Sequence, residues 1–347
     1  MSTLFRHRFW GAASVFACSA LAFCYAANYQ EKKKMEHRIA VMKMKTLCVG
    51  RFLIDVPETA LVSYRSATVE GYEISSWIET DEAFLSRNIA QEAQLKSEKN
   101  DKGGTSLEQI REIENDHLHG RLFVFNRRWQ ASFNLGVREE SQVIAVRAFV
   151  RSRDVTYSFY SKYQYDSDVP NLEKLISQLR WRGGDGIPTQ AGFCFELGLL
   201  VEPLPVDISE FTAIFVGLKE HPDLSIALST FSGATQYKPL SQREAENSIK
   251  QEYWSRFHSL REGPRALAGV MGDEVLERVD EPNGSVLHGF MWESLSKQYD
   301  PARPLMILEL DTGHGQQGRP VNSSLSDAEA LALWDKISSS LRRHHPL

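Results

Sequence analysis

The sequence has little cysteine and no large excess of charge of either sign. Four cysteines occur in 347 residues, which excludes a small domain held together by a dense set of disulfides. Lys and Arg number 40 against 45 Asp and Glu, and the net charge of -5 offers no general attraction for nucleic acid or an anionic membrane. The 42% of hydrophobic residues are enough for a buried core, and the length predicts about two domains.

Common catalytic motifs are missing as well. The sequence contains no phosphate-binding Gly-x-x-x-x-Gly-Lys-Ser/Thr loop and no Gly-x-Ser-x-Gly nucleophile elbow. Asp311-Thr312-Gly313 is typical of aspartic proteases, but their mechanism needs two carboxyl groups that share a proton, and no second such tripeptide occurs. His117 and His119 offer two imidazoles without a recognisable third ligand. We therefore expect no catalytic residues, no cofactor and no metal site.

The N-terminus has the pattern of an export segment. Arg6, His7 and Arg8 precede the uncharged and mostly apolar run 9–27, as in a secretory signal. Because this run is close to the shortest length that spans a bilayer, a cleaved signal and a retained inner-membrane anchor both remain open. Export predicts a periplasmic protein that contacts the membrane, if at all, only through this segment.

The placement of the cysteines follows from that segment. Cys18 and Cys24 lie inside it, so only Cys48 and Cys194 belong to the folded part. In an oxidising compartment one remaining pair favours a single disulfide. Two buried thiols that pack as small apolar side chains are the alternative.

Hydrophobic periodicity predicts alternating strands and helices in the first half of the chain. We expect a helix over 81–99, capped by Thr80, with Phe84, Leu85, Ile89 and Ala93 at spacings of three to four. A second helix is expected over 170–182. The strands expected from apolar and β-branched runs are 47–56, 61–69, 72–79, 120–125, 130–135, 142–151 and 155–163.

The second half repeats this order after the Gly- and Pro-rich stretch 183–188. Capping boxes at 241–244 and 326–329 predict two helices, the first with an apolar stripe at Ala245, Ile249, Tyr253 and Phe257. The expected strands are 191–200, 211–217, 224–231, 274–279, 286–292 and 304–311, with a hairpin turn at 282–284.

The repeated order predicts an α+β fold of two similar domains that arose by internal duplication, each an antiparallel sheet with two helices. We divide the chain into an export segment or anchor with a polar linker (1–45), an N-terminal domain (46–182), a linker (183–190) and a C-terminal domain (191–345). Two unrelated α+β domains would give the same coarse order of elements.

Several blocks of sequence occur in the order of a known family. With these residues the chain resembles the two-domain periplasmic immunity proteins of type VI secretion lipases, over most of 46–343. The blocks are Cys48 to Pro57, Gly192 to Phe195, His288 to Glu293, Leu308 to Gly313, Ser324 to Ala330 and Leu333 to Asp335.

The resemblance implies a non-enzymatic inhibitor with two domains arranged as a two-armed claw. Such a protein binds a cognate phospholipase toxin and holds its lid closed, which prevents interfacial activation at a membrane; it needs neither a cofactor nor nucleic acid. The toxin-binding residues are not defined by the sequence. Each cysteine lies in the first expected strand of its half, so a bridge between Cys48 and Cys194 would tie the first strands of the two domains together.

The family blocks also contain residues that we expect to determine the fold. Gly50 is expected at a turn, Pro57 at a strand end, Gly272 and Gly313 at tight turns, and Trp334 in the core. Trp292, Glu293 and Thr312 complete this set.

Two other functions remain open from the residues alone. One is a non-enzymatic binding or scaffold protein of the cell envelope, which would share the export segment and the missing catalytic motifs. The other is an aspartic-type hydrolase, which would lose its activity on Asp311→Ala.

Overall fold

The computed structural model of the chain describes residues 38–344 except 102, 135, 185, 206, 237, 297–298 and 317. The expected export segment, with Cys18 and Cys24, therefore lies outside the described residues. Within the described part of the chain, no helix has both the length and the apolar character that crossing a bilayer requires.

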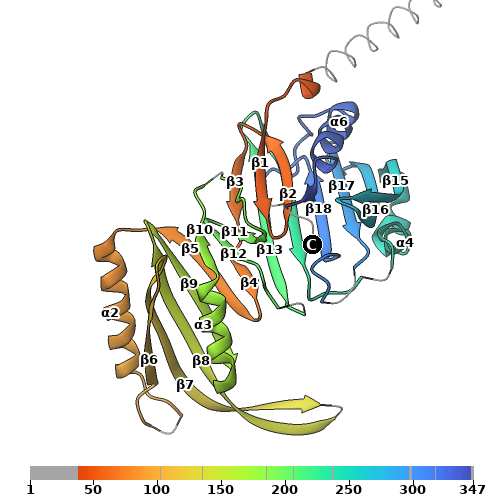
Figure 1. The fold of residues 1–347 in the computed structure, drawn as a ribbon. Coiled ribbons are helices and arrows are strands. Elements are labelled where there is room, and N and C mark those ends of the chain that lie inside the picture. Colours follow the sequence, from red (N-terminus) through yellow and green to blue (C-terminus); the bar gives the residue numbers. More distant parts are fainter. Residues whose placement is uncertain are drawn as a thin grey trace, which may run out of the picture.

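The two halves of the chain repeat one order of elements (Figure 1). Each begins with a hairpin, continues with two strands (the first of which is divided into β3 and β4 in the first half), a helical segment, a meander and a helix, and ends in a short strand. The elements of the first half are β1 (Met44–Val49), β2 (Phe52–Pro57), β3 (Leu61–Tyr64), β4 (Ala67–Val69), β5 (Tyr72–Ile78), α2 (Asp81–Ser97), β6 (Leu107–Glu114), β7 (His119–Asn134), β8 (Val137–Ser152), β9 (Val155–Gln164), α3 (Val169–Ser177) and β10 (Leu179–Trp181).

The second half has the same topology, as internal duplication predicts. Its elements are β11 (Gly192–Phe195), β12 (Gly198–Val201), β13 (Glu210–Leu218), β14 (His221–Phe231), α4 (Leu240–Ala245), α5 (Ser248–Glu252), β15 (Phe257–Leu267), β16 (Val270–Asp280), β17 (Val286–Ser294), β18 (Leu305–Asp311), α6 (Asp327–Ser338) and β19 (Arg342–Arg343).

One large antiparallel sheet runs through both halves, where we expected a separate sheet in each. Its strand order is β15-β16-β17-β18-β14-β13-β4-β5-β9-β8-β7-β6, with β3 also paired to β13. The halves meet where Ile214 pairs with Tyr64 and Glu210 with Val69. Each half would otherwise end there in an open edge strand, and pairing the two edges satisfies the backbone groups of both.

The two halves also exchange their first hairpins. The hairpin β1–β2 pairs with β19 at the end of the second half, and its Phe52 and Ile54 pack in one core with Phe290 and Trp334. Conversely, β11–β12 pairs with β10 of the first half. Each half of the molecule is therefore completed by residues from the other half of the sequence.

The exchanged hairpins are joined by a disulfide between Cys48 and Cys194, as predicted. The two Cα atoms are 5.7 Å apart across a sequence separation of 146, and both cysteines are buried. Beside the bond, the Gly50 N–H donates to the Cys194 carbonyl at 2.9 Å and the Cys194 N–H to the Gly50 carbonyl at 2.7 Å. The linker 183–190 is thus only one of several connections between the halves.

The predicted starts of α2 and α6 are confirmed, and that of α4 is not. The Thr80 hydroxyl accepts from the Ala83 N–H at 3.3 Å and caps α2, and the predicted capping box of Ser326 and Glu329 opens α6. The capping box predicted at 241–244 is wrong. The helix α4 already begins at Leu240, and the Ser241 N–H donates to the Asp273 carboxylate at 2.6 Å.

Four further expectations about the elements are wrong. The single helix expected after 241 is divided into α4, α5 and the 3₁₀ turn Trp254–Arg256, so the second half has more than two helices. The helix expected over 170–182 ends at Ser177, because 179–181 pairs with β12 as strand β10. The strand expected over 47–56 is the hairpin β1–β2, and the one expected over 191–200 is β11–β12.

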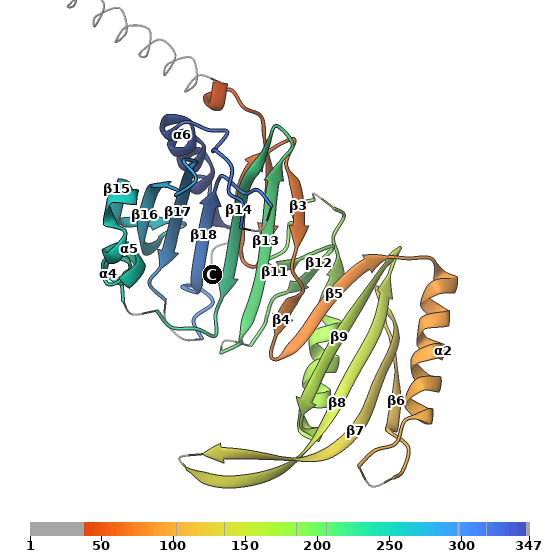
Figure 2. The ribbon, with the colours of Figure 1, turned by 180° about the vertical axis from the view of Figure 1, so that it is seen from behind.

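The longest hairpin, β7–β8, extends past the sheet as an arm (Figures 1 and 2). The strands that we expected at 120–125 and 130–135 are both part of β7. Strands β6 and β15, which form the two outer edges of the large sheet, were not predicted.

Candidate functional site

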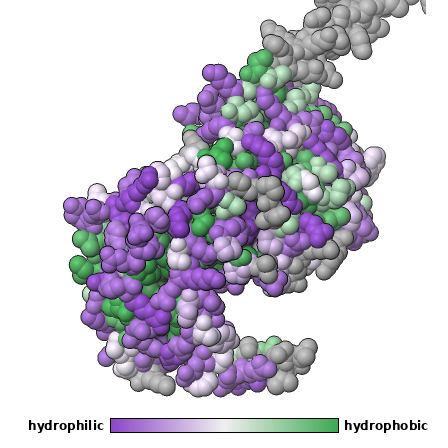
Figure 3. Space-filling view, viewed as in Figure 1, coloured by the Kyte–Doolittle hydropathy of each residue, from purple (hydrophilic) through white to green (hydrophobic). Residues whose placement is uncertain are grey.

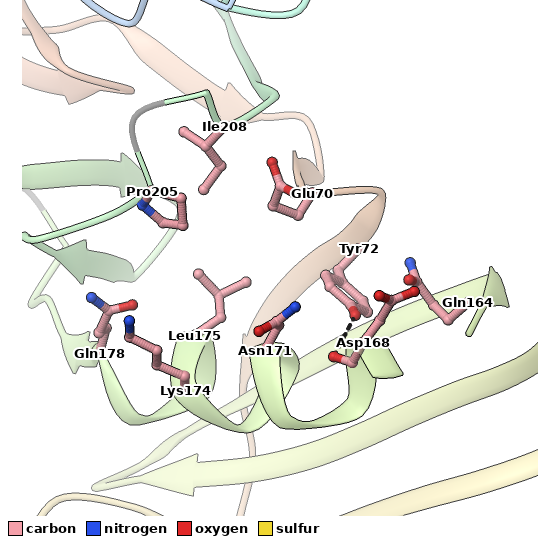
Figure 4. Close-up of a pocket in the computed structure, with 10 residues that line it drawn as sticks. All are labelled: Glu70, Tyr72, Gln164, Asp168, Asn171, Lys174, Leu175, Gln178, Pro205 and Ile208. Atoms are coloured by element: carbon pink, nitrogen blue, oxygen red, sulfur yellow. Dashed lines mark hydrogen bonds between the residues drawn. The ribbon is translucent and has the colours of Figure 1, made fainter. Parts of the chain in front are cut away.

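A pocket of about 380 Å³ lies where the two halves of the chain meet (Figure 4). One wall is α3, and the opposite wall is formed by the β4–β5 turn and the segment before β13. The lining residues are Glu70, Tyr72, Gln164, Asp168, Asn171, Lys174, Leu175, Gln178, Pro205 and Ile208. Asn171, Lys174 and Leu175 of α3 and the C-cap residue Gln178 are spaced by about one and two helical turns, so they share one face of the helix.

The floor of the pocket is apolar and its rim is polar. Tyr72, Leu175 and Ile208 are buried, whereas Asn171 and Lys174 are exposed at the rim. The Tyr72 hydroxyl donates to the Asp168 carbonyl at 3.3 Å, and burial, with the charges of Asp168 and Glu70, raises the pKa of Tyr72. Tyr72 therefore stays a neutral donor, and the pocket is suited to an apolar side chain with hydrogen-bonding groups around it.

The turn at Glu70 is fixed to the second half of the chain. The Glu70 N–H donates to the Ser209 carbonyl at 2.9 Å, and the Ser209 N–H donates to the Glu70 carboxylate at 2.9 Å. These two bonds hold the β4–β5 turn against the start of β13, so one backbone–backbone bond and one bond to the Glu70 carboxylate set the opening of the pocket between the halves.

A second depression, of about 310 Å³, shares Pro205 with the first pocket and contains Arg51, Glu202 and Tyr299. Arg51 lies in the β1–β2 turn and forms a bidentate pair with the buried Glu210, at 2.8 and 2.7 Å; it also pairs with Glu202. Burial opposes the charge of Arg51, but its bonds to Glu210 and Glu202 outweigh that effect and raise its pKa. The lining of the second depression is therefore held by ion pairs that join both halves.

The arm carries large apolar side chains in solvent. Trp129 is 60% exposed and Phe133 is 74% exposed, and their even spacing on β7 places both on one face of the arm. Figure 3 shows that the molecular surface is hollowed between the arm and the other half of the molecule. Exposed aromatic side chains on a protruding hairpin are typical of binding surfaces.

The residues expected to determine the fold are dispersed through the molecule. Gly50 has a φ of 57° at the β1–β2 turn, where a Cβ atom would meet the Thr230 hydroxyl at 2.7 Å. Pro57 ends β2, and Gly313 follows β18 with a φ of 79°. Gly272 lies inside β16 rather than at a tight turn, and the Trp292 ring packs directly over it.

The remaining members of that set lie in the core of the second half. Trp292 and Trp334 are buried, and the indole N–H groups donate to the Arg265 carbonyl at 3.0 Å and the Glu274 carboxylate at 3.2 Å, respectively. Thr312 accepts from the His288 N–H at 2.9 Å, and Glu293 pairs with Arg243. None of these residues lines the pocket beside α3.

The Asp-Thr-Gly tripeptide ends β18 beside a separate, open depression of about 500 Å³. Burial and the neighbouring Glu309 raise the pKa of Asp311 to about 6, while His314 acts in the opposite direction. Among the described residues, no hydrogen bond joins the Asp311 carboxyl to another carboxyl group. The shared proton of an aspartic protease is therefore not provided here.

We expected no Gly-x-Gly-x-x-Gly motif, but 313–318 has this spacing, and its three glycines line the same depression. A strand precedes it, but the next helix, α6, begins only at Asp327. The dinucleotide fingerprint needs the helix N-terminus directly after the glycines, so this spacing does not indicate a nucleotide site.

The histidine pair lies apart from any metal-ligand cluster. His119 begins β7 and packs edge-on against Phe84 at 5.4 Å, and His117 lies in the preceding turn. Within the described part of the chain, one group of three metal-ligand residues is found, Cys48, Cys194 and His344. Its two cysteines are bonded to each other, so they are not available as ligands.

Comparison with known proteins gives one consistent family. The sequence model of the Tle cognate immunity protein 4 N-terminal domain matches residues 45–177, and that of the Tle cognate immunity protein 4 C-terminal domain matches residues 186–346. No curated protein sequence matches the chain.

Solved structures of immunity proteins share the fold. The Tle4–Tli4 complex contains a chain with a TM-score of 0.71 and 22% identity, covering 87% of this chain and 97% of that chain. The apo immunity protein TplEi of T6SS from Pseudomonas aeruginosa has a TM-score of 0.70 and 21% identity, with the same coverage. TplEi complexed with an "L" peptide gives 0.69 and 21%, covering 87% and 98%.

Proposed function

Because the chain belongs to the Tle cognate immunity protein 4 family, we propose that it neutralises a type VI secreted phospholipase of the Tle4 kind by binding to it. The observation that carries this proposal is that both family domains match, in order, along one chain. In a solved complex, a protein of the same fold is bound to Tle4. Membership of an immunity-protein family also confirms the prediction that the chain is not an enzyme.

The binding surface that we propose is the hollow formed by the pocket beside α3 and the arm β7–β8. The apolar floor of Tyr72, Leu175 and Ile208 receives an apolar side chain of the effector, and the polar rim orders its backbone. Trp129 and Phe133 hold the effector from the other side. The two halves would then act as the arms of a claw and keep the lid of the lipase closed, which prevents its activation at a membrane.

The connections between the halves support binding without reorganisation. The continuous sheet, the exchanged hairpins, the disulfide and the Arg51–Glu210 pair fix the position of one half against the other. A surface that is already in place before binding loses less conformational entropy when the effector arrives. Rigid opposing walls therefore favour tight inhibition.

We place this function in the periplasm. The bond between Cys48 and Cys194 forms and persists in an oxidising compartment, and the expected N-terminal signal would deliver the chain there. Whether the signal is removed or remains as a tether to the inner membrane does not change the surface proposed for the effector.

The proposal is tested by exporting the full chain to the periplasm of a heterologous bacterium together with the type VI lipase encoded beside its gene. We expect the lipase alone to stop growth, and the chain to restore growth and to co-purify with it. If the chain neither binds the lipase nor reduces its activity, the inhibitor proposal fails and the envelope scaffold becomes the better interpretation.

Point variants test the surface separately from the function. Asn171→Arg inserts a long cation at the pocket rim, and Trp129→Ala removes an exposed aromatic side chain from the arm. Each is expected to weaken binding at least about 10-fold, which corresponds to roughly 1.4 kcal/mol.

Met271→Ala is the matched control, because Met271 is also exposed, at 56%, but lies in β16, far along the sheet from the arm. Its binding should equal that of the unmodified chain. Full binding by both test variants would exclude this surface and leave the immunity function itself intact.

A further inference from the structure

Helix α2 presents an apolar stripe to solvent. Its buried side consists of Phe84, Asn88, Gln91 and Leu95, and Phe84 and Leu95 pack on Phe123 and Phe149 of the sheet. Leu85 and Ile89, in contrast, are 59% and 63% exposed, and Ala93 is exposed one turn further on. Figure 3 shows apolar residues gathered over α2 at the outer edge of the molecule.

This stripe is the centre of a longer pattern with opposite charges at its ends. Glu82, Leu85, Ile89, Ala93 and Lys96 follow one another at spacings of three and four residues, so they form one seam along the helix. Glu82 is exposed in the first turn. The side chain of Lys96, in the last turn, is 61% exposed and bonds along its own helix to Glu92 at 2.6 Å.

The pattern is complementary to itself in one arrangement. If a second copy of α2 lies antiparallel with Ile89 on the two-fold axis, residues whose numbers are equally far from 89 face each other. Glu82 then lies opposite Lys96 of the second copy, twice in the pair, and Leu85 lies opposite Ala93, where the small side chain leaves room for the larger one. A parallel arrangement would place like charges together at both ends.

We propose that α2 forms an isologous, antiparallel pair with α2 of a second copy of this chain. In the two-fold arrangement the apolar stripe of each copy is buried against the other, and each charged end meets the opposite charge. The same contacts occur twice, as in closed symmetric dimers. Because α2 is only 17 residues long, or about 25 Å, the contact is at the small end of specific interfaces. Self-association is therefore concentration-dependent, with a Kd on the order of 10 µM.

The proposed pairing leaves the effector surface accessible. Phe149, which packs against α2, and Ala148, which packs in the core with α3, are adjacent on β8 and so point to opposite faces of the sheet. The helix α2 lies along the outer side of the first half (Figures 1 and 2), while the pocket is lined by α3. A dimer would therefore present two separate effector surfaces.

Sedimentation velocity of the full chain, at concentrations from about 1 to 500 µM, measures the association. The unmodified chain is expected to shift from monomer to dimer over this range, and Ile89→Glu to remain a monomer throughout. Ala90→Glu is the matched control, because residue 90 is exposed on the same helix but lies beside the seam; it is expected to dimerise normally. Monomeric unmodified chain at the highest concentration, or dimerisation of Ile89→Glu, overturns the proposal.

Charge exchange tests the register. Glu82→Lys and Lys96→Glu are each expected to raise the Kd at least about threefold, and the double variant to restore it. The double variant also reverses the charges that favour the helix dipole, so a simple loss of helix stability would make it the weakest variant. That result would contradict the antiparallel register.

A cysteine on the axis gives an independent measurement. In a chain with Cys18→Ser and Cys24→Ser, Ile89→Cys is expected to form an intermolecular disulfide under mild oxidation, and Ala90→Cys is not. Effector binding is measured for Ile89→Glu in parallel and should be unchanged. If Ile89→Glu loses the effector while the unmodified chain stays monomeric, the α2 stripe belongs to the effector interface, which overturns the dimer but not the immunity function.

Discussion

Replacing both Cys48 and Cys194 by alanine measures how strongly the disulfide stabilises the exchanged hairpins. The bond spans a sequence separation of 146, and the chain-entropy relation gives about 5 kcal/mol for a loop of this length, at the upper end of the roughly 2–5 kcal/mol lost with native bridges. The two buried sulfur atoms add about 1 kcal/mol each through lost packing. We expect the free energy of unfolding to fall by at least about 2 kcal/mol.

Urea unfolding followed by tryptophan fluorescence gives this difference, and reduction of the unmodified chain separates its two parts. Reduction removes the cross-link and keeps both sulfur atoms, so the reduced chain should lie between the oxidised chain and the double variant. A loss below about 1 kcal/mol on reduction would refute the reasoning, because it would mean that the cross-link hardly restricts the unfolded chain.

Two other predictions concern buried charges. Arg51→Met leaves Glu210 buried without its cation and should lower the free energy of unfolding by about 3–5 kcal/mol, whereas Arg51→Met with Glu210→Leu should lose clearly less; equal losses in urea unfolding would contradict the pairing. The pKa of Asp311 is raised to about 6 in the folded chain, above its value in an unfolded chain, so its contribution to stability is complete below pH 4 and is lost as the pH rises to about 6. Asp311→Asn should therefore be more stable than the unmodified chain at pH 7 by about 1–2 kcal/mol and show no such gain at pH 4; a variant that is less stable at pH 7 would contradict the assignment.

Much of the local structure follows from the sequence. Runs rich in Val, Thr, Tyr and Phe, such as 155–163, become strands because branched and aromatic side chains suit a pleated surface. The Ser326 and Glu329 pair starts α6 because the two side chains satisfy amide groups at the helix N-terminus. The repeated order of elements predicted the repeated topology of the two halves, and the single remaining cysteine pair predicted the disulfide.

Long-range pairing caused most of the errors. Leu179 fits the helical face of α3, but the backbone of 179–181 bonds to β12 from the other half, and no local pattern contains that information. Strand β6 was missed because charged residues interrupt its run, and β15 because it contains Gly263 and Pro264, which normally break strands. The apolar pattern of α2 was also misleading about burial. Leu85 and Ile89 continue the apolar spacing of Phe84, and yet both lie in solvent.

The pocket beside α3 could not be predicted for a related reason. Its residues come from a turn, a strand end, a helix and a loop of the other half, and each has an ordinary role in its own segment. Lys174 and Asn171 look like any solvent-facing positions of an amphipathic helix. Only the packing of the two halves brings them opposite Pro205 and Ile208.

The exchange of hairpins sets an order of events during biosynthesis. The β1–β2 hairpin is among the first parts of the fold to be synthesised, yet its partners, α6 and β19, are at the end of the chain. Likewise the first half cannot close its core before Phe193 and Leu200 have been added. The β1–β2 hairpin must therefore stay without its partners until nearly the full length is available, and a fragment that lacks the C-terminus leaves the apolar side chains of this hairpin uncovered, which makes it a target for proteolysis rather than a working half-inhibitor.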